Sequence, residues 1–533
     1  MPDNSRSMMQ RCSNRVPNLS HYLTRNTARW PQRPALHWKD RTWGWAELDQ
    51  RVSALCCALH NDLGIAKGDA ILVQAQNSNQ MVETMLAAFR LGAVWVPCNF
   101  RQAPGETAFA SLKSNARVFV CDAEFRDQAE AVRLERPDLK GVVTIGETDF
   151  GLDYEGLVSA HAGSQFVNEP VAYDDPCWLF FTSGSTGRPK AVVLTHGQIG
   201  FVVVNYLADL MPGTGEQDAS LVIAPLSHGA GLQLIAQLPV GTAHVLMPGG
   251  GFSPAVAFEL IEQHRVSNLF TVPTIVKRLV EDPAVDRYDH SSLRHVIYAG
   301  APMYREDQKN ALEKLGNVLV QYYGLGEVTG NITVLRPQDH SLEDGPQARA
   351  GTCGTERTGI EVSIQDDDGN LLRPGETGEV CVVGAAVCAG YLEDEAANSK
   401  SFRNGWFRTG DIGHMDEERF LYLTGRASDM YISGGSNVYP KEIEEVLLAH
   451  PDVSEVAILG VPDPQWGEIG LAVCVANTGK TVTEAELSTY LSGKIARYKM
   501  PARYLFIEEM PTSAYGKITK KLVREHLQEK GLI

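Results

Sequence analysis

The chain has little of several features that define large classes of protein. Ten cysteines are scattered through 533 residues, with no CxxC pair and no histidine spacing typical of zinc sites, so the sequence predicts free thiols in a reducing compartment. Basic residues are outnumbered, because 48 Lys+Arg against 65 Asp+Glu give a net charge of −17. This balance disfavours a nucleic-acid partner, since a phosphate backbone is bound through an excess of Lys and Arg. A small anionic ligand stays compatible with it, because a few local cations suffice.

Long hydrophobic runs are also missing. Residues 221–240 form the most apolar long window, but Ser227, His228, Pro239 and two glycines interrupt it. Such a window is typical of a buried segment and not of a membrane span. The first 20 residues contain arginines but no apolar stretch of the kind found in secretory signals. The sequence therefore predicts a cytoplasmic protein with no integral membrane segment.

The composition, 44% hydrophobic and 21% charged, is that of an ordinary globular protein. Apolar runs at 70–73 and 93–96 read as buried strands on either side of an amphipathic stretch over 78–91, and the pattern recurs downstream. Short buried strands separated by helices are typical of βαβ units in mostly parallel sheets. Residues 351–422 instead contain short strands with Gly and Pro turns, which predicts a smaller β-rich subdomain.

The chain after Gly425 changes pattern again, with amphipathic helices expected over 440–449 and 483–491 between apolar strands. This mixture is typical of a compact α+β domain. The predicted fold class is therefore α/β. A large N-terminal lobe over 1–425 is built of parallel-sheet βαβ layers plus the β-rich subdomain, and a small α+β C-terminal lobe covers 426–533.

The strongest local motif is Phe-Thr-Ser-Gly-Ser-Thr-Gly-Arg-Pro-Lys over 181–190. Its glycines permit close approach, its hydroxyls and backbone N–H groups can surround phosphate oxygens, and Lys190 adds a positive charge. The Walker A spacing is absent, which excludes a P-loop NTPase. Taken alone, the motif is equally compatible with a flexible Ser/Gly turn.

The motif resembles the phosphate loop of the adenylate-forming superfamily, which includes acyl-CoA synthetases, peptide-synthetase adenylation domains and luciferases. Further blocks typical of this family follow in its order along nearly the whole chain: YAGAP at 298–302, YGLGE at 323–327, WFRTGD at 406–411, GRASD at 425–429, ISGGSNVYP at 432–440 and GKI at 516–518. Independent chance matches to so many ordered blocks are implausible, so the chain is identified as a member of this superfamily.

The resemblance implies a two-step reaction. A carboxylate attacks the α-phosphorus of ATP to give an acyl-adenylate and pyrophosphate, and a thiol then displaces AMP. The residues that match the family's nucleotide site are Thr182, Ser183, Gly184, Ser185, Thr186, Gly187, Gly300, Ala301, Pro302, Tyr323, Asp411 and Arg426. Within this set Tyr323 would stack on adenine, Asp411 would accept hydrogen bonds from the ribose hydroxyls, and Arg426 would contact ribose or phosphate.

The catalytic residues that the resemblance implies are Lys190, Glu327, Arg426 and Lys517. Glu327 matches the position that holds Mg²⁺, a hard ion that prefers oxygen ligands. Lys517 matches the lysine that reaches the α-phosphate and the substrate carboxylate. Without the ordered blocks, Lys517 would read as a surface charge and Asp411 as a turn residue.

The family rotates its small lobe about the segment that matches 425–429, so the C-terminal lobe is expected to be mobile, with Ser428 at the pivot. Ser433, Gly434 and Gly435 match the segment that this rotation presents for transfer to CoA. Ser428 departs from the Asp or Lys that relatives commonly carry, so a charged contact that would hold one conformer is missing there.

Two more departures from the family pattern lie near the phosphates. Ala191 replaces a usual glycine, which a negative φ tolerates. Gly326 replaces a usual threonine, so a hydroxyl donor is lost beside the phosphate and carboxylate. Thr329 is the candidate that could compensate for this loss.

The acyl pocket that the resemblance implies is lined by small and apolar residues: His228, Gly229, Thr271, Ala299, Gly324 and Gly326. The segments that carry them hold no Arg or Lys to pair a second carboxylate, which disfavours dicarboxylic and amino acids as substrates. His228 is either a gate at the pocket wall or a core histidine. Medium-chain fatty, aryl and alicyclic acids all fit.

The predicted enzyme is an acyl-CoA synthetase with ATP and CoA as co-substrates and Mg²⁺ as cofactor. CoA is favoured as acceptor because no carrier domain follows Lys517 and because residues 462–468 resemble a stretch of stand-alone acyl-CoA synthetases. The alternatives are an acyl-AMP ligase that serves a separate carrier protein, and a degenerate member that binds nucleotide without turnover. The sequence is also compatible with a homodimer.

Overall fold

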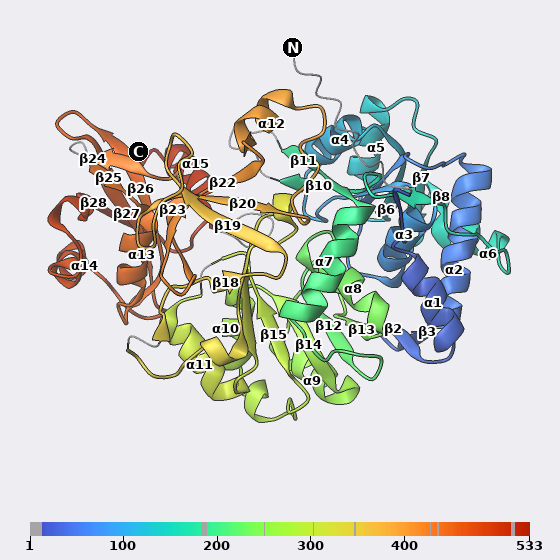
Figure 1. Ribbon diagram of the computed structural model, residues 1–533, viewed down its shortest axis with the longest axis horizontal. Coiled ribbons are helices and arrows are strands. Elements are labelled where there is room, and N and C mark those ends of the chain that lie inside the picture. The colour runs from blue at the N-terminus through green and yellow to red at the C-terminus, as the bar shows by residue number, and fades with distance from the viewer. Residues whose placement is uncertain are drawn as a thin grey trace, which may run out of the picture.

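The computed structural model describes residues 13–182, 189–249, 251–301, 303–345, 348–426, 428–433, 436–512 and 518–533. The first part of the chain, up to about β18, builds a broad body from two sheets and their helices (Figure 1). A third sheet lies on this body, and the last strands and helices form a separate lobe at one end. The predicted α/β class with two unequal lobes is confirmed.

The first large sheet has seven strands in the order β11-β10-β5-β4-β6-β7-β8. These strands are β4 (Ala70–Gln74), β5 (Val94–Pro97), β6 (Ala116–Asp122), β7 (Gly141–Ile145), β8 (Leu152–Asp153), β10 (Pro176–Thr182) and β11 (Lys190–Thr195). All neighbours are parallel except the β10–β11 hairpin, whose last described pair is Thr182 with Lys190. The ends of the phosphate-loop motif therefore face each other across one ladder.

The second large sheet has nine strands in the order β18-β17-β16-β15-β14-β12-β13-β2-β3. Its strands are β2 (Pro34–Trp38), β3 (Arg41–Gly44), β12 (Ala219–Val222), β13 (Ala243–Leu246), β14 (Val266–Thr271), β15 (His295–Tyr298), β16 (Leu319–Tyr323), β17 (Thr333–Leu335) and β18 (Thr355–Glu356). The central strands from β2 to β16 are parallel. Their carboxyl ends share one edge, which is where open α/β sheets bind ligands.

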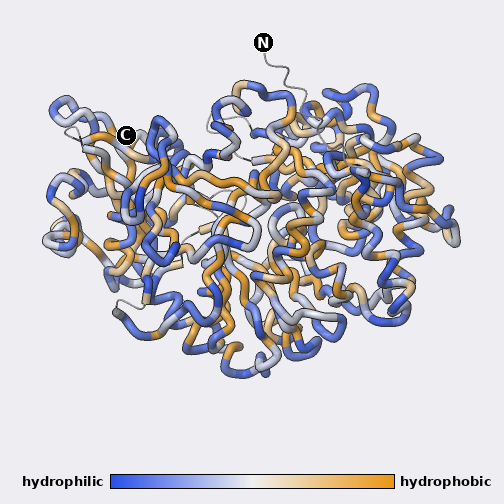
Figure 2. Tube along the Cα trace, in the orientation of Figure 1, coloured by the Kyte–Doolittle hydropathy of each residue, from blue (hydrophilic) through white to orange (hydrophobic). Residues whose placement is uncertain are grey.

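The helices of the large lobe cover these two sheets. They are α1 (His21–Arg29), α2 (Trp45–Cys57), α3 (Asn79–Arg90), α4 (Pro104–Lys113), α5 (Arg126–Glu135), α6 (Tyr154–Ala160), α7 (His196–Asp209), α8 (Gly229–Gln237), α9 (Pro254–His264), α10 (Pro273–Glu281) and α11 (Arg305–Leu315). The apolar helices α7 and α8 lie between the sheets, and hydrophobic segments concentrate in the interior while the outer loops are hydrophilic (Figure 2). The helix predicted over 78–91 and the strands on either side of it are confirmed.

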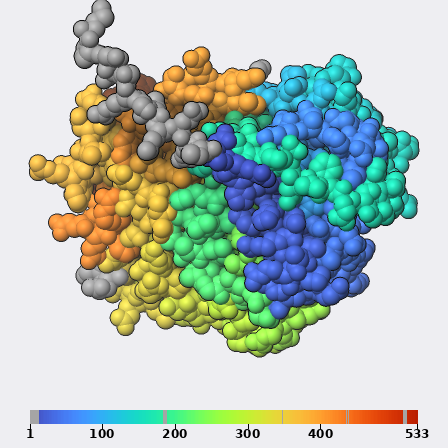
Figure 3. Space-filling model, turned by 45° about the vertical axis from the view of Figure 1, so that its right-hand side comes forward, coloured from blue at the N-terminus to red at the C-terminus, as the bar shows by residue number. Residues whose placement is uncertain are grey.

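The third sheet matches the predicted β-rich subdomain. It is antiparallel and contains β19 (Ile360–Gln365), β20 (Gly378–Gly384), β21 (Phe402–Arg403), β22 (Trp406–Met415) and β23 (Leu421–Arg426), with α12 (Glu395–Ser401) before β21. In the space-filling view the green segment that includes α7 reaches the surface between the blue N-terminal part and the yellow and orange segments of the later chain (Figure 3).

The small lobe has a hydrophobic core of its own, to which Tyr431, Ile443, Leu447 and Ile458 contribute. Its elements are β24 (Tyr431–Ser433), β25 (Ser436–Val438), α13 (Pro440–Leu448), β26 (Val453–Asp463), β27 (Gly467–Ala476), α14 (Glu484–Leu491), β28 (Arg503–Phe506) and α15 (Lys520–Glu529). The two helices predicted there are confirmed.

The predicted free thiols are supported within the described residues. The nine cysteines that fall in them are buried and carry free thiols, and burial raises the pKa of Cys98 to about 12. No helix in the described ranges is both long enough and apolar enough to cross a bilayer.

A buried polar cluster joins three helices of the large lobe. Glu83 of α3 is fully buried, and its carboxylate accepts hydrogen bonds from Arg51 of α2 at 2.7 and 3.1 Å, Asn79 at 2.8 Å and Tyr154 of α6 at 3.0 Å. A carboxylate in this position is stable only because several donors replace water.

We predict that Arg51→Met lowers the free energy of unfolding by about 3 kcal/mol, because it leaves the Glu83 charge buried without its cation. Urea denaturation measures the change. Arg41→Met is the matched control: Arg41 pairs with Glu47 on the surface, with side chains 58% and 40% exposed, and its loss should cost under about 1 kcal/mol. Equal losses for the two variants would contradict a structural role for the buried cluster.

Candidate active site

Thr182 and Lys190, which are predicted to contact phosphate, lie near the predicted metal-binding residue Glu327. This side chain is buried in a short 3₁₀ turn, Gly326–Val328, just after β16. Its Oε1 accepts a hydrogen bond from the Tyr391 hydroxyl at 3.0 Å and from Thr182 Oγ1 at 3.3 Å. Lys190 Nζ lies 4.8 Å from the centroid of the Tyr391 ring. Thr182, Lys190 and Glu327 therefore meet around Tyr391, a residue that the sequence analysis missed.

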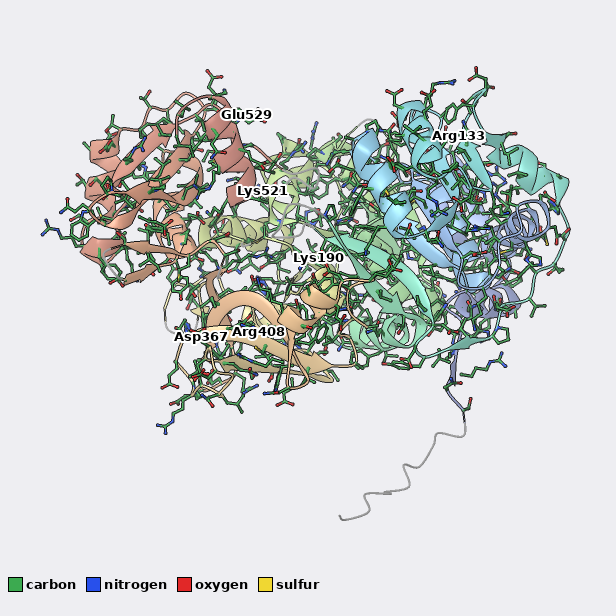
Figure 4. All side chains as sticks on the ribbon, turned by 90° about the horizontal axis from the view of Figure 1, so that it is seen from above. Arg133, Lys190, Asp367, Arg408, Lys521 and Glu529 are labelled. Atoms are coloured by element: carbon green, nitrogen blue, oxygen red, sulfur yellow. The ribbon has the colours of Figure 1, made fainter. Side chains whose placement is uncertain are left out.

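In the view from above, Lys190 lies near the middle of the molecule, between Lys521 of the small lobe and Arg133 of the large lobe (Figure 4). The candidate site residues Thr182 and Lys190 come from the first large sheet, and Glu327 follows a strand of the second. Tyr391 follows β20 and precedes α12 and belongs to none of the ordered sequence blocks. An isolated tyrosine gives no signal by its spacing.

A second cluster forms around Asp411 of β22. The Tyr323 hydroxyl donates to Asp411 Oδ2 at 2.6 Å, and Arg426 Nε donates to Oδ1 at 3.1 Å. Asp411 and Arg426 are direct partners in the β22–β23 ladder, which brings their side chains together. Tyr323 comes from the end of β16 in another sheet. The three residues predicted to hold adenosine are therefore brought into contact.

Burial and charge act in opposite directions on Asp411. Its side chain is almost fully buried. Burial raises the pKa of Asp411, while the Arg426 guanidinium lowers it less strongly. Burial and the adjacent Asp411 carboxylate both raise the pKa of Tyr323. The phenol therefore keeps its proton and acts as the donor in this pair.

Close contacts with aromatic rings explain two glycines of the predicted acyl pocket. A Cβ on Gly229 would lie 2.6 Å from the Phe270 ring, and a Cβ on Gly326 would lie 2.7 Å from the Phe180 ring. Both distances are too short for van der Waals contact, so a side chain at either position would require the neighbouring ring to move. A Cβ on Gly324 would meet the backbone of Gly330 at 2.3 Å.

The other predicted pocket residues lie near these glycines. His228 is half-buried at the N-terminus of α8, with its ring centroid 5.0 Å from that of Phe180. Thr271 and Ala299 are buried where β14 and β15 end, and the Ala299 N–H donates to the Thr271 carbonyl at 3.2 Å. Phe180 is a further residue that the sequence analysis missed.

Thr329 does not supply the donor that Gly326 lacks. Its hydroxyl donates to the adjacent Val328 carbonyl at 2.6 Å and accepts from Asn331 at 3.2 Å. The side chain is fully buried, and φ is 53°. Its hydrogen-bonding capacity is used within the loop.

Arg357 is a buried cation that lies outside the segments considered for the acyl pocket. Its guanidinium lies 4.6 Å from the Tyr206 ring centroid and 5.9 Å from that of Tyr322, and its Nε is 3.9 Å from Asp209 Oδ2. The carboxylate of Asp209 compensates this charge, which stabilises the core around the carboxyl end of α7.

Some predicted residues lie outside the described ranges, namely Ser183, Gly184, Ser185, Thr186, Gly187, Pro302, Gly434, Gly435 and Lys517. Gly300 and Ala301 are exposed just after β15, at the sheet edge that carries Thr271. Ser433 ends β24 and pairs with Ser436 in the β24–β25 hairpin. The exposed Ser428 hydroxyl donates to Asp429 at 3.3 Å.

A lysine of the small lobe contacts the large lobe beside the predicted hinge. Lys441 Nζ, on α13, donates to the Leu423 carbonyl of β23 at 2.8 Å and lies 3.4 Å from Glu445. The positive charge of Lys441 also lowers the pKa of Asp411, although burial outweighs it. This contact between the lobes involves no residue of the GRASD block, so the motif could not predict it.

We predict that Arg426→Met destabilises the protein more at about pH 8 than at about pH 5. The variant leaves the Asp411 carboxylate buried without its cation, and acid removes that cost by protonating Asp411, whose pKa burial already raises. Thermal melting at both pH values measures the difference. In an Asp411→Asn background the pH dependence should disappear, and its persistence would assign the effect to another group.

Comparison with known proteins identifies the family to which the chain belongs. The family described as "AMP-binding enzyme" matches residues 23–392, and "AMP-binding enzyme C-terminal domain" matches residues 442–517. An indoleacetate–CoA ligase of Aromatoleum aromaticum is 33% identical over 515 residues, covering 96% of this chain and 98% of that protein.

Solved structures agree with this relationship. The o-succinylbenzoate–CoA synthetase of Bacillus subtilis, in complex with its acyl-adenylate, has a TM-score of 0.83 and 31% identity, covering 96% of this chain and 98% of that one. An amide bond synthetase of Marinactinospora thermotolerans has a TM-score of 0.85 and 29% identity, with coverages of 95% and 99%. The chain therefore belongs to the AMP-binding enzyme family and is an AMP-forming acid–thiol ligase of the acyl-CoA synthetase type.

Proposed function

We propose that this enzyme activates an apolar carboxylic acid as its acyl-adenylate, with release of pyrophosphate, and transfers the acyl group to CoA. The observation that carries the proposal is the joining of Tyr323, Asp411 and Arg426, from two sheets, into one hydrogen-bonded cluster. A carboxylate that is positioned by a phenol and a guanidinium can bind a ribose, because the ribose hydroxyls donate hydrogen bonds to a carboxylate.

In the first step an anion must approach a polyanion, so positioning and charge neutralisation dominate catalysis. We assign neutralisation to Lys190, at the end of the phosphate loop, to Arg426 and to Lys517. Thr182 would donate to phosphate from the end of β10, together with the loop residues 183–187. Asp411 would hold the ribose, and Tyr323, Gly300, Ala301 and Pro302 would surround the adenine.

The donor set around Glu327 fits Mg²⁺ that enters with the nucleotide. Within the described ranges there is no group of three or more His, Cys, Asp or Glu side chains that could hold a metal alone. Mg²⁺ commonly binds through one or two carboxylates plus substrate phosphates, and Glu327 provides one carboxylate beside Thr182. When bound, the ion would neutralise charge on the phosphates.

For the second step we propose that the lobe from 426 to 533 rotates about Ser428, which removes Lys517 and presents Ser433, Gly434 and Gly435 to the thioester site. A few backbone dihedrals suffice for such a hinge. The acyl group would occupy the space bounded by His228, Gly229, Thr271, Ala299, Gly324 and Gly326. The CoA ligases among the relatives favour CoA as acceptor over a carrier protein.

The direct test is pyrophosphate release from ATP and Mg²⁺ over a panel of fatty, aryl and alicyclic acids, with and without CoA. We expect sustained release that requires CoA for one class of acid. Release of about one equivalent per enzyme that CoA does not change would instead indicate a separate carrier. Absence of release with every acid would contradict the proposal.

Lys517→Ala should lower pyrophosphate release about 10²- to 10³-fold, because one charge-stabilising donor is lost from the first transition state. Conversion of supplied acyl-AMP and CoA to thioester should stay near the wild-type rate. Lys521→Ala is the control, since Lys521 on α15 is exposed and lies 3.7 Å from Glu525. Equal losses in both half-reactions would show that the role of Lys517 is assigned wrongly.

Asp411→Asn should raise the KM for ATP about tenfold or more, because hydrogen bonds to a charged group contribute about 1.5–3 kcal/mol. The KM for the acid should change little. Steady-state kinetics at saturating acid provide the measurement. Asp367→Asn, at an exposed position before β20, is the control and should leave both constants unchanged. An unchanged KM for ATP in Asp411→Asn would exclude the ribose contact.

A further inference from the structure

The absence of a side chain at Gly326 has a steric cause in Phe180. A Cβ at 326 would lie 2.7 Å from both Cδ1 and Cε1 of Phe180 and 3.0 Å from Thr182 Cγ2. The backbone of Gly326 has no positive φ, so its conformation is open to any residue. The Phe180 ring is therefore the main obstacle to a side chain at 326, and a smaller residue at 180 would remove that obstacle.

Phe180 also lies beside the reacting end of the site. Side chains two residues apart on a strand share one face, so Phe180 and Thr182 of β10 point the same way, and Thr182 contacts Glu327. The Phe180 ring centroid is 5.0 Å from that of His228 and 6.0 Å from that of Trp178. The ring is only half-buried, and it bridges two predicted pocket residues, His228 and Gly326.

A second aromatic pair lies against the neighbouring pocket glycine. Phe270 and Tyr322 stack with centroids 5.7 Å apart and an interplanar angle of 19°. A Cβ on Gly229 would lie 2.6 Å from the Phe270 ring and 3.4 Å from the Tyr322 hydroxyl oxygen. Gly229 follows His228 directly in the chain. Aromatic rings therefore border the predicted pocket, and glycines form part of its wall.

Aromatic rings favour offset or edge contacts with other rings and gain about 0.5–1.5 kcal/mol per pair beyond area burial. A flat acyl group can meet several of these rings at once, whereas a flexible alkyl chain loses rotamer freedom without that gain. We propose that Phe180, accommodated by Gly326, is a specificity-determining residue that selects aryl carboxylic acids over alkyl acids. This inference rests on the proposed acyl-CoA synthetase activity and names its substrate class.

The first test compares kcat/KM for one aryl and one alkyl acid of similar size. Phe180→Leu should lower the aryl-to-alkyl ratio about tenfold, mainly through the KM for the aryl acid, with the KM for ATP unchanged; Phe180→Tyr should keep the ratio. Phe181→Leu is the matched control, because Phe181 points to the opposite face of β10 and packs in another core cluster. A ratio that Phe180→Leu leaves unchanged, or that Phe181→Leu lowers equally, would overturn the proposal.

The second test is a double-mutant cycle at 180 and 326. Gly326→Ala alone should lower both the melting temperature and the kcat/KM for aryl acids, because its Cβ meets the Phe180 ring. In Phe180→Leu/Gly326→Ala the melting temperature should recover, so the two effects should not add. Additive effects would show that the ring and the glycine are not coupled.

The two tests separate the inference from the activity on which it rests. The melting-temperature cycle reports on the Phe180–Gly326 contact without turnover. If the wild-type protein activates no acid at all, the proposed function fails while the steric coupling still stands. If it activates alkyl acids better than aryl acids and Phe180→Leu leaves that preference unchanged, the inference fails while the function stands.

Discussion

The buried carboxylate of Asp411 links two sheets of the large lobe. Tyr323 reaches it from the second sheet, and Arg426 reaches it from the last strand before the small lobe. Because a buried charge is stable only when donors replace its water, this one group constrains the third sheet against the end of β16. The same constraint places the predicted ribose contact next to the predicted hinge segment.

Close packing of glycines against aromatic rings gives the predicted acyl site its form. Gly229 and Gly326 leave room for Phe270 and Phe180, and neither position tolerates even a Cβ without movement of a ring. The Phe180 ring occupies the space that the side chain of a threonine at 326 would need. Thr329 does not replace the missing hydroxyl, because its own hydroxyl donates within its loop.

The contact between the lobes lies close to this chemistry. Lys441 binds the carbonyl of Leu423 on the strand that ends in Arg426, and its charge acts on Asp411. Rotation of the small lobe would break this hydrogen bond and reduce the positive charge near the ribose contact. The proposed rotation of the small lobe would therefore act on the predicted ribose contact through Lys441.

The sequence by itself determined the α/β class, several strands and helices and the family, because hydrophobic periodicity and ordered motifs are local properties of the chain. It also predicted that Thr182, Lys190, Glu327 and Asp411 belong to one site. Only the tertiary structure decided that Phe180 faces Gly326, that Tyr391 holds Glu327 and that Lys441 meets Leu423. These contacts join segments far apart in the chain, and packing, which periodicity does not encode, brings them together.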